Sequence, residues 1–265
     1  MKSRIRLILI ALISLFVLAG FSKSTKLRTN NSANLAVQKE SKKTDISWTG
    51  TLNGKTAIFI HYQLDYEVII GEIVYLNTKD RTPIKLIGTI ENWDKKYRIL
   101  EFDKTGNITG IITGLPEKDK FVGSWFSPKT RKEFILSLSK QDTLIFSKDF
   151  RPDLSDIFGK YHYQYGEAGY MGDFKLTRIS KSKASFQIFS VTGEPARNIA
   201  EIKSNTLNLA KREFIYKVPE TDSCEFKVKF YKDFVLLHYT KGGCEGQFGH
   251  NATIEGIFIK TNSLK

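Results

Sequence analysis

From residue 45 onward, short runs of alternating apolar and polar residues are separated by turn residues, and almost no window holds the 3.6-residue period of a helix. The links between runs are short and carry turn residues such as Asn53 and Gly54. Short links favour antiparallel pairing of consecutive strands, so the first half predicts a meander that curves strongly or closes into a barrel. The strands expected in this half are 46–52, 56–64, 68–76, 84–91, 97–103, 108–115, 121–127 and 133–139.

A second series of the same kind follows the stretch 141–157, which reads as a connector. The chain is therefore expected to be all-β, with two tandem antiparallel meander β-barrels or strongly curved sheets of about eight strands each. The expected domains are 45–140 and 158–265. The runs in the second domain are 158–165, 170–178, 185–191, 198–203, 206–209, 213–218, 224–230, 234–239 and 253–260.

The N-terminus has the layout of a secretory signal peptide over residues 1–22. A basic start precedes the apolar run 7–21, and small residues Gly20 and Ser22 are compatible with cleavage. The run is short for a membrane-spanning helix, so a retained anchor is the alternative. Residues 23–44 are polar and predict a flexible tether. These features predict a periplasmic or secreted protein that contacts a membrane only through the signal peptide, if that is not cleaved.

The chain is basic, with a formal net charge of +13 that falls to +10 when Lys2, Arg4 and Arg6 are removed. This charge favours loose attraction to acidic glycans or anionic headgroups. Because the lysines fall singly in turns and on alternating strand positions rather than on one element, we expect no nucleic-acid partner.

Cys224 and Cys244 are the only cysteines, and in an exported chain they predict one disulfide. They flank a predicted hairpin that turns at Lys232 and Asp233, and a bulge at 242–243 would absorb the remaining offset. A zinc site is disfavoured because no second cysteine pair or close histidine accompanies them.

Motifs of enzymes are missing from the sequence: there is no Gly-x-Ser-x-Gly elbow, no His-Glu-x-x-His and no phosphate-cradling loop. We therefore expect no enzyme, no cofactor and no metal. A carboxylate pair of Glu91 and Glu101 would suit glycan chemistry if both faced one cavity. Glu101 shares strand parity with Tyr97 and Ile99, which makes it either a polar group inside the domain, paired with a lysine or arginine, or a solvent-facing residue. His162 and His238 lie in the same half of the chain and could meet.

Aromatic side chains are the remaining candidates for binding, because they could line a barrel mouth and stack on a sugar or an apolar ligand, although strand cores are also ordinarily aromatic. The proposed ligand-binding residues are Trp48, Tyr75, Tyr97, Glu101, Trp125, Tyr161, Tyr163 and His238.

Two stretches carry a resemblance to known proteins. One runs from 84 to 125 and includes Gly123-Ser124-Trp125; the other comprises 244–249, Asn251 and Gly256-Ile257-Phe258. They resemble uncharacterised exported β-barrel envelope proteins of Bacteroidetes-like bacteria and, distantly, lipocalins and avidins. The resemblance implies an exported barrel. Lipocalins and avidins carry their Gly-x-Trp step on the first strand and this chain carries it on about the seventh, so no binding residue is carried over.

These observations predict a non-enzymatic binding protein of the cell envelope, whose partner is a small ligand, a glycan or a protein. Two alternatives remain: an inhibitor of a secreted hydrolase such as lysozyme, and a glycan-acting enzyme using Glu91 or Glu101. The positive charge weakens the first alternative, because a basic lysozyme would repel the protein.

Overall fold

The computed structural model describes residues 45–142, 153–221, 223–244 and 246–262. These residues contain strands and turns, and no helix among them is long and apolar enough to cross a membrane. The signal peptide 1–22, the tether 23–44 and most of the connector 141–157 lie outside the described residues. Residues 42–265 form one compact unit.

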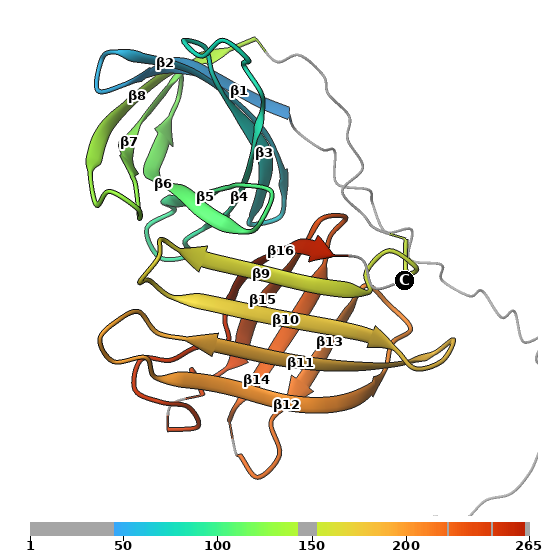
Figure 1. The fold of residues 1–265 in the computed structure, drawn as a ribbon. Coiled ribbons are helices and arrows are strands. Elements are labelled where there is room, and N and C mark those ends of the chain that lie inside the picture. Colours follow the sequence, from blue (N-terminus) through green and yellow to red (C-terminus); the bar gives the residue numbers. More distant parts are fainter. Residues whose placement is uncertain (1–44, 143–152, 222, 245, 263–265) are drawn as a thin grey trace, which may run out of the picture. The chain divides into compact units, whose positions relative to one another are not determined.

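The first half is a closed eight-stranded barrel (Figure 1). Each strand pairs antiparallel with the next, and β8 returns to pair with β1, with Thr51 opposite Ser137. The meander expected from the alternation is therefore confirmed, and it closes. The strands are β1 (Asp45–Leu52), β2 (Thr56–Asp65), β3 (Val68–Tyr75), β4 (Ile84–Ile90), β5 (Tyr97–Phe102), β6 (Asn107–Glu117), β7 (Lys120–Phe126) and β8 (Glu133–Gln141).

The second half is an open, curved sheet in the order β12-β11-β10-β9-β16-β15-β14-β13. In Figure 1, β9 to β12 lie side by side in one layer and β13 to β16 lie behind them. The first and last strands, β9 and β16, pair, whereas β12 and β13 form no ladder with each other. The strands are β9 (Gly159–Tyr165), β10 (Met171–Arg178), β11 (Lys183–Val191), β12 (Ile199–Asn208), β13 (Glu213–Lys217), β14 (Glu225–Phe230), β15 (Phe234–Lys241) and β16 (Gly256–Asn262).

Strand β12 corrects one expectation, because the runs 198–203 and 206–209 form a single strand. The polar residues between them belong to a bulge: Ile202 pairs with Ile188, and the next pair joins Asn205 to Phe186. One extra residue on β12 is absorbed without a turn, which is how a β-bulge works.

Apolar side chains that point inward fill both halves. In the barrel the buried cluster includes Trp48, Tyr62 and Phe121. In the sheet, Phe174 contacts the rings of Tyr161 and Phe230, each with centroids 5.8 Å away. Outward-facing residues of β3 to β5, such as Ile87 and Leu100, belong to the same cluster as the core of the sheet.

Candidate functional site

The carboxylate of Glu101 lies inside the barrel and receives three hydrogen bonds from neutral donors. Tyr75 Oη and Trp125 Nε1 both donate to Oε2, at 2.7 and 3.1 Å. Thr109 Oγ1 donates to Oε1 at 2.7 Å. These donors come from β3, β7 and β6, and Glu101 from β5, so four strands meet at one carboxylate. Glu101 is only 3% exposed.

Strand register explains how the Trp125 ring reaches this carboxylate. Glu101 pairs with Gly110 on β6, and a Cβ atom at Gly110 would lie 2.3 Å from Trp125 Nε1. Only glycine leaves room for the indole there, because real Cβ atoms do not approach that closely. The ring then stacks on Phe134, with centroids 5.8 Å apart and planes 21° apart.

The expectation that a lysine or arginine pairs with a buried Glu101 is wrong. Among the described residues, no lysine or arginine lies within ion-pair distance of its carboxylate, and the donors are a phenol, an indole and a hydroxyl. Burial and the nearby charge of Glu101 raise the pKa of Tyr75 far above its ordinary value. The phenol therefore stays protonated and keeps donating. The sequence did not identify Thr109 as a partner of Glu101, because its position is set by a bulge where the pairing of β5 with β6 shifts between Glu101 and Phe102.

Loops at the two ends of the barrel carry different charges. In an up-and-down barrel the links from odd to even strands share one end, and here they are 53–55, 76–83, 103–106 and 127–132. They hold seven cations and two acids. We call this the basic end. The links at the opposite end, 66–67, 91–96 and 118–119, hold three cations and four acids. The seven cations, all exposed, are Lys55, Lys79, Arg81, Lys104, Lys129, Arg131 and Lys132.

The half-buried rings of Tyr75, Trp125 and Phe134 lie at the same end of the barrel as these cations. Tyr75 is the last residue of β3, Trp125 precedes the last residue of β7, and Phe134 follows the first residue of β8. The basic end thus combines partly exposed aromatic surface with seven exposed cations. The Glu101 carboxylate holds two of the three aromatic side chains, Tyr75 and Trp125, by hydrogen bonds. This combination is suited to an anionic ligand that also offers apolar ring faces.

Trp48 and Tyr97, which were expected in the same site, belong to the core deeper in the barrel. Trp48 Nε1 donates to Tyr62 Oη at 3.2 Å. Tyr97 meets the rings of Tyr62 and Phe121 edge-on, both at 6.1 Å between centroids. Both side chains are buried, so the structure places them away from the half-exposed rings of the basic end.

Tyr161 and Tyr163 lie in the core of the second half. Tyr161 donates to the carbonyl of Ile157, and Tyr163 meets Phe258 edge-on at 4.7 Å between centroids. Burial raises the pKa of both phenols above the ordinary value. The two tyrosines share the inner face, as their spacing predicts, and fill the sheet.

His238 lies on the outer face of β15, half-buried and opposite Lys227 on β14. His162 instead lies on β9, opposite Ile259 and within 2.8 Å of an Asp173 oxygen. The two histidines therefore do not share a site.

We expect His238 to titrate below 6.5, because burial and then the positive charges of Lys227 and Lys229 lower its pKa. The unfolded chain then binds a proton first as the pH falls below about 6.5, so this residue lowers stability progressively in acid. Proton NMR titration of the His238 ring measures the pKa. Lys227→Gln should move the midpoint toward 6.5, and a wild-type midpoint at or above 6.5 would contradict the assignment.

Glu91 and Glu101 cannot flank one glycosidic bond. Glu101 pairs with Leu86, and Glu91 lies five residues further along, just past the end of β4. At a strand rise of about 3.3 Å per residue this places them about 17 Å apart. Glycosidase carboxylates need separations of roughly 5–10 Å.

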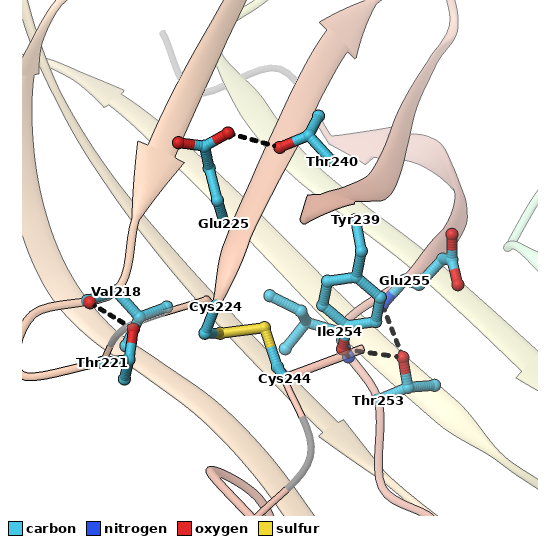
Figure 2. The surroundings of a disulfide bond; sticks show 10 residues. All are labelled: Val218, Thr221, Cys224, Glu225, Tyr239, Thr240, Cys244, Thr253, Ile254 and Glu255. Carbon is cyan, nitrogen blue, oxygen red and sulfur yellow. Dashed lines mark hydrogen bonds between the residues drawn. A yellow bond between two sulfur atoms is a disulfide. The ribbon is translucent and has the colours of Figure 1, made fainter. Parts of the chain in front are cut away.

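The expected disulfide is confirmed: the sulfur atoms of Cys224 and Cys244 are 1.94 Å apart (Figure 2). The offset between the strands is absorbed at Thr240, not at 242–243, because Glu225 pairs with Lys241 and Phe226 with Tyr239. Thr240 Oγ1 donates to the Glu225 carboxylate at 2.7 Å beside this bulge. The bond points to an oxidising compartment outside the cytoplasm.

Comparisons with known proteins leave the chain without an assigned family. No family model matches it, and no curated protein or solved structure is significantly similar to it. The resemblance to envelope barrels, lipocalins and avidins stays a prediction.

Proposed function

We propose that the chain is an exported, non-enzymatic binding protein that holds an acidic glycan at the basic end of the first barrel. The observation that carries the proposal is the charge difference between the barrel ends, seven cations and two acids against three cations and four acids. A uronic-acid polymer supplies both carboxylates for the cations and ring faces for the half-buried aromatic side chains. The periplasm or the extracellular space is where an exported protein would meet such a polymer.

Binding is favoured over catalysis by the state of Glu101. Its carboxylate is buried and accepts three hydrogen bonds, and Glu91 lies too far away to act with it. A general acid or base needs a free position within hydrogen-bond reach of the substrate. We assign Glu101 a positioning role, in which it holds Tyr75 and Trp125 in place.

Replacing Lys129 and Lys132 together by glutamine should weaken binding of a galacturonic-acid oligomer about tenfold. The estimate assumes that each exposed cation contributes about 0.5–1 kcal/mol. Isothermal titration calorimetry at low salt measures the affinity. The methyl-esterified form of the same galacturonic-acid oligomer serves as the neutral probe. The matched control replaces Lys118 and Lys120 at the opposite end and should change affinity less than twofold.

Equal losses in both double variants, or equal binding of the neutral oligomer, would contradict a site at the basic end. A glycan-acting enzyme has its own signature. If wild-type protein released new reducing ends from the oligomer and Glu101→Gln abolished them, the non-enzymatic proposal would be wrong. Glu101→Gln suits this test because the amide oxygen can accept from Tyr75 and Trp125, and its NH2 group can donate to the Thr109 hydroxyl.

A further inference from the structure

The end of the barrel opposite the basic end carries two highly exposed aromatic side chains on neighbouring hairpin tips. Tyr66 is 82% exposed in the turn between β2 and β3, and Trp93 is 83% exposed in the turn between β4 and β5. They are the two most exposed large apolar side chains of the described residues. We call them the tip pair.

Contacts between the two turns keep the tip pair together. The backbone N–H of Ile90 donates to the carbonyl of Glu67 at 2.9 Å, and Asn92 Nδ2 donates to the Glu67 carboxylate at 3.4 Å. Glu67 of the turn between β2 and β3 is therefore bound by two residues at the turn between β4 and β5. The two turns present their aromatic side chains from the same part of the barrel rim.

The backbone at Tyr66 shows that the turn itself does not require this side chain. Asp65 pairs with Val68, which leaves a two-residue turn, and Tyr66 has a φ of +58°. Glycine, asparagine or aspartate normally occupies such a position, and a bulky residue there is an outlier. Lys95 and Lys118, in the other turns at this end, also have positive φ values, so the turn tolerates several side chains and does not by itself select a tyrosine.

Each ring of the tip pair has a lysine ammonium beside it. Lys96 Nζ lies 5.8 Å from the centre of the Trp93 ring, and Lys229 Nζ lies 5.7 Å from that of Tyr66. Carboxylates hold both ammonium groups in place, since Lys96 pairs with Asp94 at 3.0 Å and Lys229 with Asp65 at 2.8 Å. Tryptophan and tyrosine are enriched at the headgroup region of a bilayer, and a lysine there keeps its ammonium in water.

The position of the tip pair also fits a membrane. The first described residue, Asp45, starts β1 at this same end, so the chain enters the barrel here, and a retained signal peptide would be connected to this end. The rings project from convex turns, and a convex tip suits a deformable lipid surface better than a polymer chain, which needs a groove. We propose that the tip pair docks this end of the barrel on a membrane surface.

This inference extends the expectation that only residues 1–22 contact a membrane, and it does not depend on glycan binding at the basic end. Docking through the tip pair would point the basic end away from the bilayer. One orientation would thus serve both proposals, although each stands on its own residues.

The test is cosedimentation of the protein with vesicles of phosphatidylcholine, a lipid without net charge, because the basic end would bind an anionic lipid by itself. The variant Tyr66→Ser/Trp93→Ser should bind at least about tenfold more weakly than the wild type, because interfacial affinity scales with the apolar area inserted. The matched control is Val122→Ser/Ile135→Ser, which removes exposed apolar side chains from the wall of the same barrel and should bind like the wild type.

Fluorescence adds a readout that does not depend on any anchoring by the N-terminal segment. Trp93 emission should be quenched by lipids labelled near the headgroup, and Trp93→Phe should remove the quenching. Equal vesicle binding by both double variants with unquenched Trp93 would overturn the proposal. Binding to an insoluble neutral polysaccharide in place of vesicles would also overturn it and would identify the tip pair as a sugar platform.

Discussion

Phe174→Ala is expected to lower the free energy of unfolding of the second half by about 3–5 kcal/mol, the range for truncating a fully buried phenylalanine. Phe174 is 1% exposed, and its ring contacts aromatic rings from β9, β11, β14 and β16. Truncation therefore leaves a cavity between the two layers of the open sheet. A closed barrel could contract around such a cavity, but β12 and β13 do not pair to hold the layers together.

Urea unfolding followed by far-ultraviolet circular dichroism measures this loss. All three tryptophans, Trp48, Trp93 and Trp125, lie in the first barrel, so their fluorescence reports on that half and shows whether it unfolds together with the second. Trp93→Ala is the control, because truncating an exposed side chain should change stability by no more than about 0.5 kcal/mol. A Phe174→Ala variant as stable as this control would show that the sheet repacks.

Cys224→Ala is expected to cost about 3 kcal/mol, because the disulfide closes a loop across a sequence separation of 20 residues and restricts the unfolded chain. Alanine is preferred to serine, since Cys224 and Cys244 are both buried and a hydroxyl there would add its own cost. The bond also ties the end of β15 to the start of β14 next to the bulge at Thr240. Thermal unfolding under oxidising conditions gives the change.

Non-additivity provides the internal check. Cys244→Ala should cost the same as Cys224→Ala, and the double variant should cost no more than either, because only one bond is lost. Adding a reductant should destabilise the wild type and leave the variants unchanged. Independent, additive losses would show that the cysteines act through packing and not through the bond.

The local pattern of residues was sufficient for most strands. The alternation at 56–64 and 84–91 predicted β2 and β4 to within one residue, because the period of two in side-chain direction is a property of each strand alone. It failed at β12, where polar residues between Ile202 and Asn205 resemble a turn. A bulge and a turn use similar residues, and only the pairing with β11 distinguishes them.

The candidate site was predictable in part. Tyr75, Glu101 and Trp125 were expected to bind ligand, and the structure brings them together at one carboxylate. The same list also contained Tyr161 and His238, which the fold places in a core and on an outer face. Aromatic residues in a strand sequence are equally compatible with a core and a binding surface, so residue type could not separate them.

By itself, the sequence determined the all-β class, the positions of nearly all strands, the inner and outer faces of each strand and the cysteine pair, because each follows from neighbouring residues or from elimination. Only the tertiary structure decided that β8 closes on β1 while β12 and β13 stay apart, that Thr109 and Gly110 complete the surroundings of Glu101, and that the charged loops separate into a basic end and an opposite end. These features depend on the register between strands far apart in the chain. Barrel closure sets that register collectively, and no single strand encodes it.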